Sequence, residues 1–300
     1  MRLHPLLAIE ATKLLYISPE GRPWHLAGVG AGIEGVVLGD GLGGHFDMPV
    51  SLLLSEGARQ DGATVLRSVR SKKEIDFPVS IGGDTIPLIF RSARHFHAVH
   101  DAWLRDWSTD RPGTLAWFTR HQGWRFQPVQ RDGAVVPLTG IDPQQNYHEI
   151  LQMSALAADP AMRSFDEPST WTNVDGLNEG VVHARNAADQ PAWPRYTMNG
   201  PGRWHIGDPV DGDVSRLVQT PVIAAGETLR INPHPRYRTA RVYSDAAPSG
   251  RNVWAQLAGR SWFAQIPPWT SVPIPVVVTD GGTTASSITV TVTPRLSRPY

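Results

Sequence analysis

Histidines are the first side chains of this sequence whose spacing suggests chemistry. His95, His97 and His100 stand close together, and His121 follows further along the chain. On a helix, His97 and His100 would be near neighbours while His95 would point elsewhere. A zinc site usually adds carboxylates or a His-Glu-x-x-His arrangement, and here only Asp101 lies nearby. We therefore expect no metal site, and we interpret these histidines as polar residues beside a buried helix face.

A glycine-rich stretch over residues 28–44 holds eight glycines and matches G-x-G-x-x-G twice, from Gly30 and from Gly39. A dinucleotide site needs a helix that starts at the third glycine, because the helix N-terminus holds the pyrophosphate. Only three residues separate Gly35 from Gly39, so no helix fits. We expect a closely packed or flexible loop and no nucleotide cofactor.

Other catalytic patterns are missing from the sequence. It has no G-x-S-x-G, no marked Ser/His/Asp trio, no P-loop and no cysteine for thiol chemistry. Carboxylates are plentiful, but nothing marks a pair at the separation that glycoside hydrolysis requires. We therefore expect no enzyme and no cofactor.

Eleven tryptophans are the remaining candidates. Trp193, Trp204, Trp254 and Trp262 are able to stack on sugar rings, which would make the chain a carbohydrate-binding β-sandwich module. The other interpretation is that they fill the core or subunit interfaces, where tryptophan is enriched. Our candidate interface or glycan-contact aromatics are Trp193, Trp204, Trp262 and Trp269.

The first half of the chain is expected to be mainly β with one helix. Strict alternation of apolar and polar residues over 72–81 predicts a half-buried strand. Phe96, Val99, Trp103 and Trp107 form one apolar stripe of a helix over 92–107, with Ser92 as its N-cap. Further strands are expected over residues 6–17, 49–55, 63–68, 114–119, 124–129 and 147–153, and the polar stretch 159–178 is expected to be a linker.

The second half is expected to be a β-sandwich, because about seven short strands follow one another at close spacing. Asp280-Gly281-Gly282 is expected to reverse the chain between strands over 274–279 and 288–293. Between Ser261 and Pro294 the only charged residue is Asp280. We interpret this charge-poor, aromatic ending as a contact surface between protein copies, since it would bury without desolvating charges.

Composition excludes several classes of partner. Lys+Arg and Asp+Glu number 28 each, and no window is basic, which argues against nucleic-acid binding. No apolar run reaches the roughly 18 residues of a membrane helix, so we expect no membrane insertion.

The C-terminal half resembles a known group of phage proteins. The motifs are NAADQPAWPRYTMNGPG (Asn186–Gly202), GRSWFAQIPPWTS (Gly259–Ser271) and the terminal RPY (Arg298–Tyr300). They are similar to minor tail proteins of long-tailed actinobacterial phages, of the distal tail (Dit) type. Met198 departs from this pattern, which has a β-branched residue there.

The N-terminal half fits the same resemblance. The strand KKEIDFPVSI (Lys72–Ile81), one helix and the hairpin GTLAWFTRHQGWR (Gly113–Arg125) look like the belt domain of such proteins. The resemblance implies a ring-forming belt domain over 1–165 and a galectin-like β-sandwich domain over 166–300.

The resemblance also implies a role. Dit proteins form a homo-hexameric ring that joins the tail tube to the tip or baseplate. The implied partners are the tail tube protein, the tail-associated hub protein and the tape measure protein. The expected location is the virion tail tip, after synthesis in the host cytoplasm. The alternative remains a carbohydrate-binding module that adheres to host cell-wall glycan.

Overall fold

The computed structural model describes residues 11–83, 92–138, 140, 142–210, 212–213 and 215–300. The chain forms two compact units, one of Met1–Ser164 with Leu296–Tyr300 and the other of Phe165–Arg295. The chain therefore passes between the units twice, and its last five residues belong to the first unit. They lie within the range 166–300 that was expected for the second domain. The fold is mainly β, as predicted.

The first unit is built on an antiparallel sheet with the central order β2-β1-β7-β8-β10-β6-β3. Strand β6 (Lys73–Gly82) pairs with β10 (His148–Ala157) over ten positions. Its Ile75, Phe77, Val79 and Ile81 are buried, which confirms the predicted alternation. The other strands of this sheet are β1 (Lys13–Ile17), β2 (Pro23–Ala27), β3 (Val36–Leu38), β7 (Gly113–Thr119), β8 (Gly123–Arg131), β9 (Val136–Pro137), β11 (Met162–Arg163) and β22 (Arg295–Leu296). Residues 6–10 of the expected strand over 6–17 lie outside the described residues.

Helix α2 (Ala93–Asp106) confirms the predicted helix, and the Ser92 hydroxyl accepts from the His95 amide at 3.2 Å. Its aromatic face joins the sheet core, where Trp107 stacks on Tyr16 with ring centroids 3.8 Å apart. The buried Trp24 donates from Nε1 to Asp106 at 2.7 Å. A short helix absent from the predictions, α3 (Pro143–Asn146), precedes β10. In the described part of the chain, no helix is long and apolar enough to cross a membrane.

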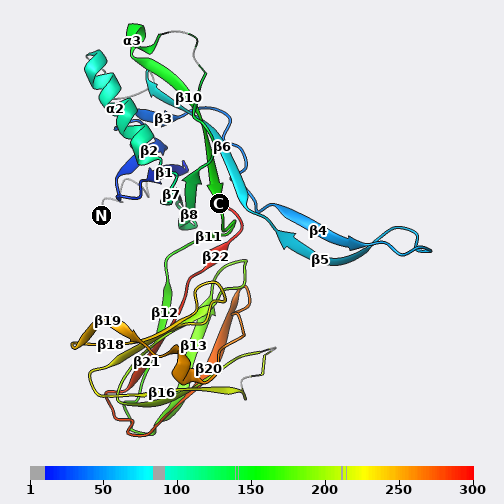
Figure 1. Ribbon diagram of the computed structural model, residues 1–300, viewed down its shortest axis with the longest axis vertical. Helices are drawn as coiled ribbons and strands as arrows, with labels where there is room; N and C mark the ends of the chain where they lie inside the picture. The colour runs from blue at the N-terminus through cyan, green and yellow to red at the C-terminus, as the bar shows by residue number, and fades with distance from the viewer. Residues whose placement is uncertain (1–10, 84–91, 139, 141, 211, 214) are drawn as a thin grey trace. The chain divides into compact units, whose positions relative to one another are not determined.

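Strands β4 (Val50–Ser55) and β5 (Thr64–Arg70), which follow β3 and precede β6 in the chain, form a separate two-stranded hairpin that extends away from the sheet (Figure 1). Both strands were predicted, within two residues of these bounds. Their separation from the main sheet was not predicted.

The second unit is a β-sandwich. One sheet has the order β12-β21-β14-β17-β18-β19 and the other β13-β20-β15-β16. Apolar side chains from both sheets form one core, with Trp204, Ile274 and Val290 among its fully buried members. The strands are β12 (Glu167–Thr172), β13 (Glu179–Asn186), β14 (Pro194–Asn199), β15 (Gly202–Gly207), β16 (Leu217–Ile223), β17 (Thr228–Asn232), β18 (Thr239–Ser244), β19 (Ala247–Asn252), β20 (Thr270–Thr279) and β21 (Ser287–Val292), and η1 (Trp254–Leu257) is a 3-10 helix.

The structure refines two expectations about this unit. The stretch 159–178 is not only a linker, because β12 lies within it and pairs with β21 over six positions. The turn at Asp280-Gly281 does reverse the chain, but β20 and β21 are not hairpin partners. They belong to different sheets, so this turn carries the chain across the sandwich.

Candidate assembly surface

The hairpin of β4 and β5, here called the arm, is an apolar surface that lies open in the described part of the chain. Every residue of both strands is exposed. Seven of them are large aliphatic side chains with exposed fractions between 41% and 59%: Val50, Leu52, Leu53, Leu54, Val65, Leu66 and Val69. A contiguous apolar surface of this kind marks an interaction site in a soluble protein.

Both faces of the arm are apolar. Val50 and Leu52 point to one face, while Leu53 and Val69 point to the other, because side chains alternate along each strand. The pairing shifts between Leu53 and Leu54, which marks a β-bulge that twists the hairpin. A two-stranded ribbon is marginally stable by itself in water, so an arm with two apolar faces is suited to being covered on both.

The charged residues in the two strands of the arm are all basic. Arg67 and Arg70 lie in β5, and neither strand contains an acidic residue. Acidic residues occur only in the connecting loop, at Glu56 and Asp61. The surface that covers the arm should therefore be apolar with neutral or acidic groups at its rim.

The arm joins the sheet through a tightly packed root. Gly44 lies so close to β6 that an added Cβ would stand 1.8 Å from the Glu74 carbonyl oxygen, and its φ is +69°. Lys73, the first residue of β6, is fully buried and donates from Nζ to the His45 carbonyl at 3.3 Å. Burial lowers the pKa of Lys73 to about 8, against the opposing effect of Asp47. The segment that leads into the arm is thus held against β6, the strand that follows the arm in the chain.

The four predicted aromatics divide into two groups. Trp204 and Trp262 are 0% and 1% exposed and belong to the sandwich core. This differs from their expected role, because a ring that packs the core offers no surface to a glycan or a neighbouring subunit. Trp193 is half-buried and lines an open hollow of about 430 Å³ with Phe263, while Trp269 is 69% exposed. These last two remain candidate contact residues.

The charge-poor ending also has a different place from the one expected. Strand β21 lies between β12 and β14, and its Ile288, Val290 and Val292 are fully buried. Its threonines do not form an open edge, since Thr289 exchanges a hydroxyl hydrogen bond with Thr170 at 2.8 Å. The low charge of β21 therefore serves the core of its own subunit, while Phe263 and Trp269 of the same ending stay exposed.

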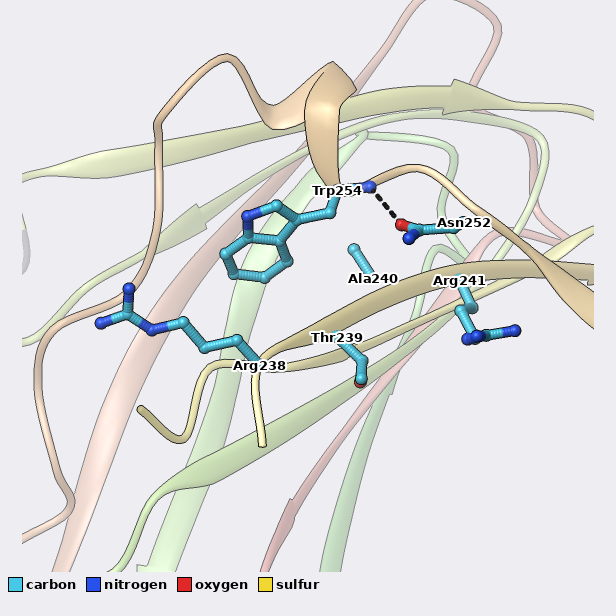
Figure 2. A pocket seen from close by; sticks show the side chains of 6 residues that line it. All are labelled: Arg238, Thr239, Ala240, Arg241, Asn252 and Trp254. Atoms are coloured by element: carbon cyan, nitrogen blue, oxygen red, sulfur yellow. Dashed lines mark hydrogen bonds between the residues drawn. The ribbon is translucent and has the colours of Figure 1, made fainter. Parts of the chain in front are cut away.

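A second hollow, of about 260 Å³, lies between β18, β19 and η1 in the sandwich. Figure 2 shows the indole of Trp254 between Arg238 on one side and Arg241 with Asn252 on the other. The Trp254 amide donates to the Asn252 side chain at 2.9 Å, which fixes the start of η1. Trp254 was one of the tryptophans considered for sugar stacking, and it is half-buried here.

The histidines do not assemble into a metal centre. His100 contacts Glu149 at 3.2 Å and Asp101 at 3.3 Å. Among the described residues, no group of three or more His, Asp or Glu side chains is placed to hold a metal ion.

The arm is a candidate functional surface that the sequence predictions did not include, although the sequence carries a signal for it. Leu52, Leu53 and Leu54 are consecutive, and a strand with apolar residues in succession is one that is covered on both faces. Within the described part of the fold, no element supplies that cover on either face.

Comparisons with known proteins agree with this architecture. No protein-family model matches the chain. The chain is 23% identical to the minor tail protein Gp27 of Mycobacterium phage L5, over 90% of this chain and 92% of that protein. Its fold is similar to the Dit protein of phage SPP1, with a TM-score of 0.65 at 10% identity, covering 95% of this chain and 99% of the other.

A chain of the phage P2 baseplate in its activated conformation is similar as well. Its TM-score is 0.56 at 7% identity, over 94% of this chain and 98% of that one. These relatives are named as tail and baseplate proteins and not as enzymes, and they do not favour the carbohydrate-binding alternative. The predicted place in the phage virion tail agrees with them. By sequence the chain is similar to a mycobacteriophage minor tail protein and by fold it is Dit-like, which agrees with the predicted resemblance to Dit-like minor tail proteins.

Proposed function

We propose that this chain is a structural protein of the phage tail tip that forms a ring between the tail tube and the tip or baseplate hub. In this proposal the first unit builds a ring of six copies, and the second unit is a galectin-like sandwich. The likeness to a mycobacteriophage minor tail protein and to Dit and baseplate chains supports the tail-tip role.

The observation that carries ring formation is the arm. Its seven aliphatic side chains are open on both faces of an otherwise well-packed unit. Fully burying a Val or Leu side chain contributes about 1.5–3 kcal/mol, so side chains that are already about half covered still have roughly 1 kcal/mol each to gain. The arm as a whole therefore offers a gross gain of about 7 kcal/mol per contact, before the cost of ordering and association.

The geometry of an arm favours a head-to-tail contact. An extended hairpin on one copy docks on a different surface of the next copy, which makes the contact heterologous. Such contacts generate a closed ring when the rotation between copies returns to the start. If two arms paired with each other instead, a two-fold dimer would form, and the experiment below distinguishes the two.

The proposed partners are the tail tube protein above the ring, the tail-associated hub protein below it and the tape measure protein inside. The role needs no cofactor and no catalysis. It also needs no specific nucleic-acid contact, in line with the balanced charge of 28 basic and 28 acidic residues.

Sedimentation velocity of the purified chain, alone and mixed with its tail tube protein, tests the proposal. We expect a species near six times the 32.9 kDa monomer, or a defined complex with the tube protein. Negative-stain images of that species should show a ring. A chain that stays monomeric even with the tube protein, or that stops at a dimer, would overturn it.

A further inference from the structure

The last residues of the chain contact the segment that leads into the arm. Arg298 pairs with Asp47, at 3.0 Å from Nη2 and 3.2 Å from Nε, and its guanidinium lies 5.5 Å from the Phe46 ring centroid. The Tyr300 ring lies 5.6 Å from Phe46 and 6.5 Å from His45. Three successive residues just before β4 are thus held by the two ends of the Arg-Pro-Tyr terminus.

The terminus is itself anchored on the sheet of the same unit. The Arg125 guanidinium, on β8, donates to the Arg298 carbonyl. Just upstream, β22 pairs with β11. The final residues therefore connect the sheet of the first unit to the entrance of the arm.

The residues that follow β5 also bind the segment that precedes β4. The Ser71 amide donates to the Pro49 carbonyl at 3.1 Å, which closes the hairpin, and Lys73 then holds the His45 carbonyl. The Asp47 carboxylate also accepts from the Met48 amide at 2.8 Å. Asp47 thus links the terminus, through Arg298, to the first backbone amide of the hairpin root.

We propose that Leu296–Tyr300 is a strap that holds the root of the arm, with Arg298 and Tyr300 as positioning residues for docking on the next copy. The role in docking rests on the proposed function, whereas the hold on the root does not. An exposed ribbon that is attached at its root alone loses conformational freedom when it docks. That loss of freedom weakens binding. A strap that orders the root beforehand reduces the loss.

The strap acts through several contacts together. The Arg298–Asp47 pair is about half exposed on both sides, and such an ion pair contributes little alone. Replacing Arg298 by aspartate adds repulsion from Asp47, and removing Arg298–Tyr300 also deletes the ring packing. We therefore expect about threefold weaker assembly for Arg298→Asp and about tenfold for the truncation after Ser297.

Hydrogen exchange of the full chain, read at the Ser71 amide, whose acceptor is the Pro49 carbonyl and not the Asp47 side chain, tests the hold directly. We expect faster exchange there in Arg298→Asp, in Asp47→Arg and in the truncation, with the amides of β6 and β10 unchanged. The double variant Asp47→Arg/Arg298→Asp should restore slow exchange, because it reverses the pair without removing it. Arg238→Asp, in the other unit, serves as the charge control.

Two outcomes separate the strap from the ring. Wild-type exchange at the root in all three variants would overturn the strap and leave the proposed function standing. In the other outcome, the root exchanges faster in the variants, but they assemble at the same protein concentration as the wild type. That result would overturn the link between the strap and docking, and it would count against the arm as the ring contact. Should the truncation fail to fold, Tyr300→Ala and the charge-reversal pair carry the same test.

Discussion

Leu52 and Leu53 give the sharpest test of the arm, because they point to its opposite faces. They are 57% and 46% exposed in the single chain. Since about half of each side chain is still to be buried, each contributes roughly 1 kcal/mol to a contact that covers it. The double change Leu52→Ser/Leu53→Ser should then weaken assembly by about 2 kcal/mol, which is roughly 30-fold in the dissociation constant.

The same change should leave the single chain nearly as stable as before. Substitutions at exposed positions away from packed features usually stay within about 0.5 kcal/mol. Sedimentation velocity over a concentration series measures assembly, and urea unfolding of the dilute monomer measures stability. Leu177→Ser is the matched control, because Leu177 is 71% exposed on a loop of the sandwich and should change neither quantity.

The arm is refuted as a contact surface if the double variant loses stability instead of assembly. A double variant that assembles at the wild-type concentration while losing more than about 2 kcal/mol of stability would show that the arm packs within its own subunit. A partial result is also informative, since a defect in only one of the two single variants would mean that the neighbour covers one face.

Burial lowers the pKa of Lys73 to about 8 from its ordinary 10.5. Between these values the unfolded chain binds more protons, so stability should rise with pH across that window, by at most about 3 kcal/mol. Urea unfolding at pH 7.5 and 10 measures this dependence, and the free energy of unfolding of Lys73→Met should not rise between the two pH values. At pH 7.5 the variant should be at least as stable as the wild type, and a clear loss of stability there would contradict the burial cost assigned to Lys73. The Asp208 carboxylate is fully buried, pairs with Arg216 and accepts from two backbone amides at 2.9 and 3.0 Å. Asp208→Ala should therefore lower the stability of the sandwich by about 3 kcal/mol, and calorimetry showing almost no loss would refute this role. Trp204→Ala should lower the free energy of unfolding by about 3–5 kcal/mol, because it leaves a cavity in the core, and should leave assembly of the folded protein unchanged. A wild-type melting temperature together with defective assembly would show instead that Trp204 contributes to a subunit interface.

Local patterns identified most elements correctly, because they depend on neighbours in the chain. The alternation of β6 and the apolar stripe of α2 are set by the two-residue and 3.6-residue periods of the backbone. The Ser92 cap needs only the amide three residues later. The strands of the sandwich are bounded by prolines and glycines for the same local reason.

Partner choice was beyond the reach of such patterns. Strand β12 is polar and was assigned to a linker, and it becomes a strand because β21 supplies its hydrogen-bond partners. The turn at Asp280-Gly281 signals a reversal, but the same signal suits a tight hairpin and a crossing between sheets. Only packing of the two sheets on a common core selects the crossing.

The sequence by itself determined a mainly β chain, its helix, its Dit-like motifs and the lack of catalytic patterns, since each follows from residue types and short spacings. The tertiary structure decided which apolar residues are covered. It placed Trp204 and Trp262 inside the sandwich and left Leu52 and Leu53 open on the arm. Burial depends on which distant segments meet, and hydrophobicity alone does not distinguish a side chain that packs its own core from one that remains exposed for a partner.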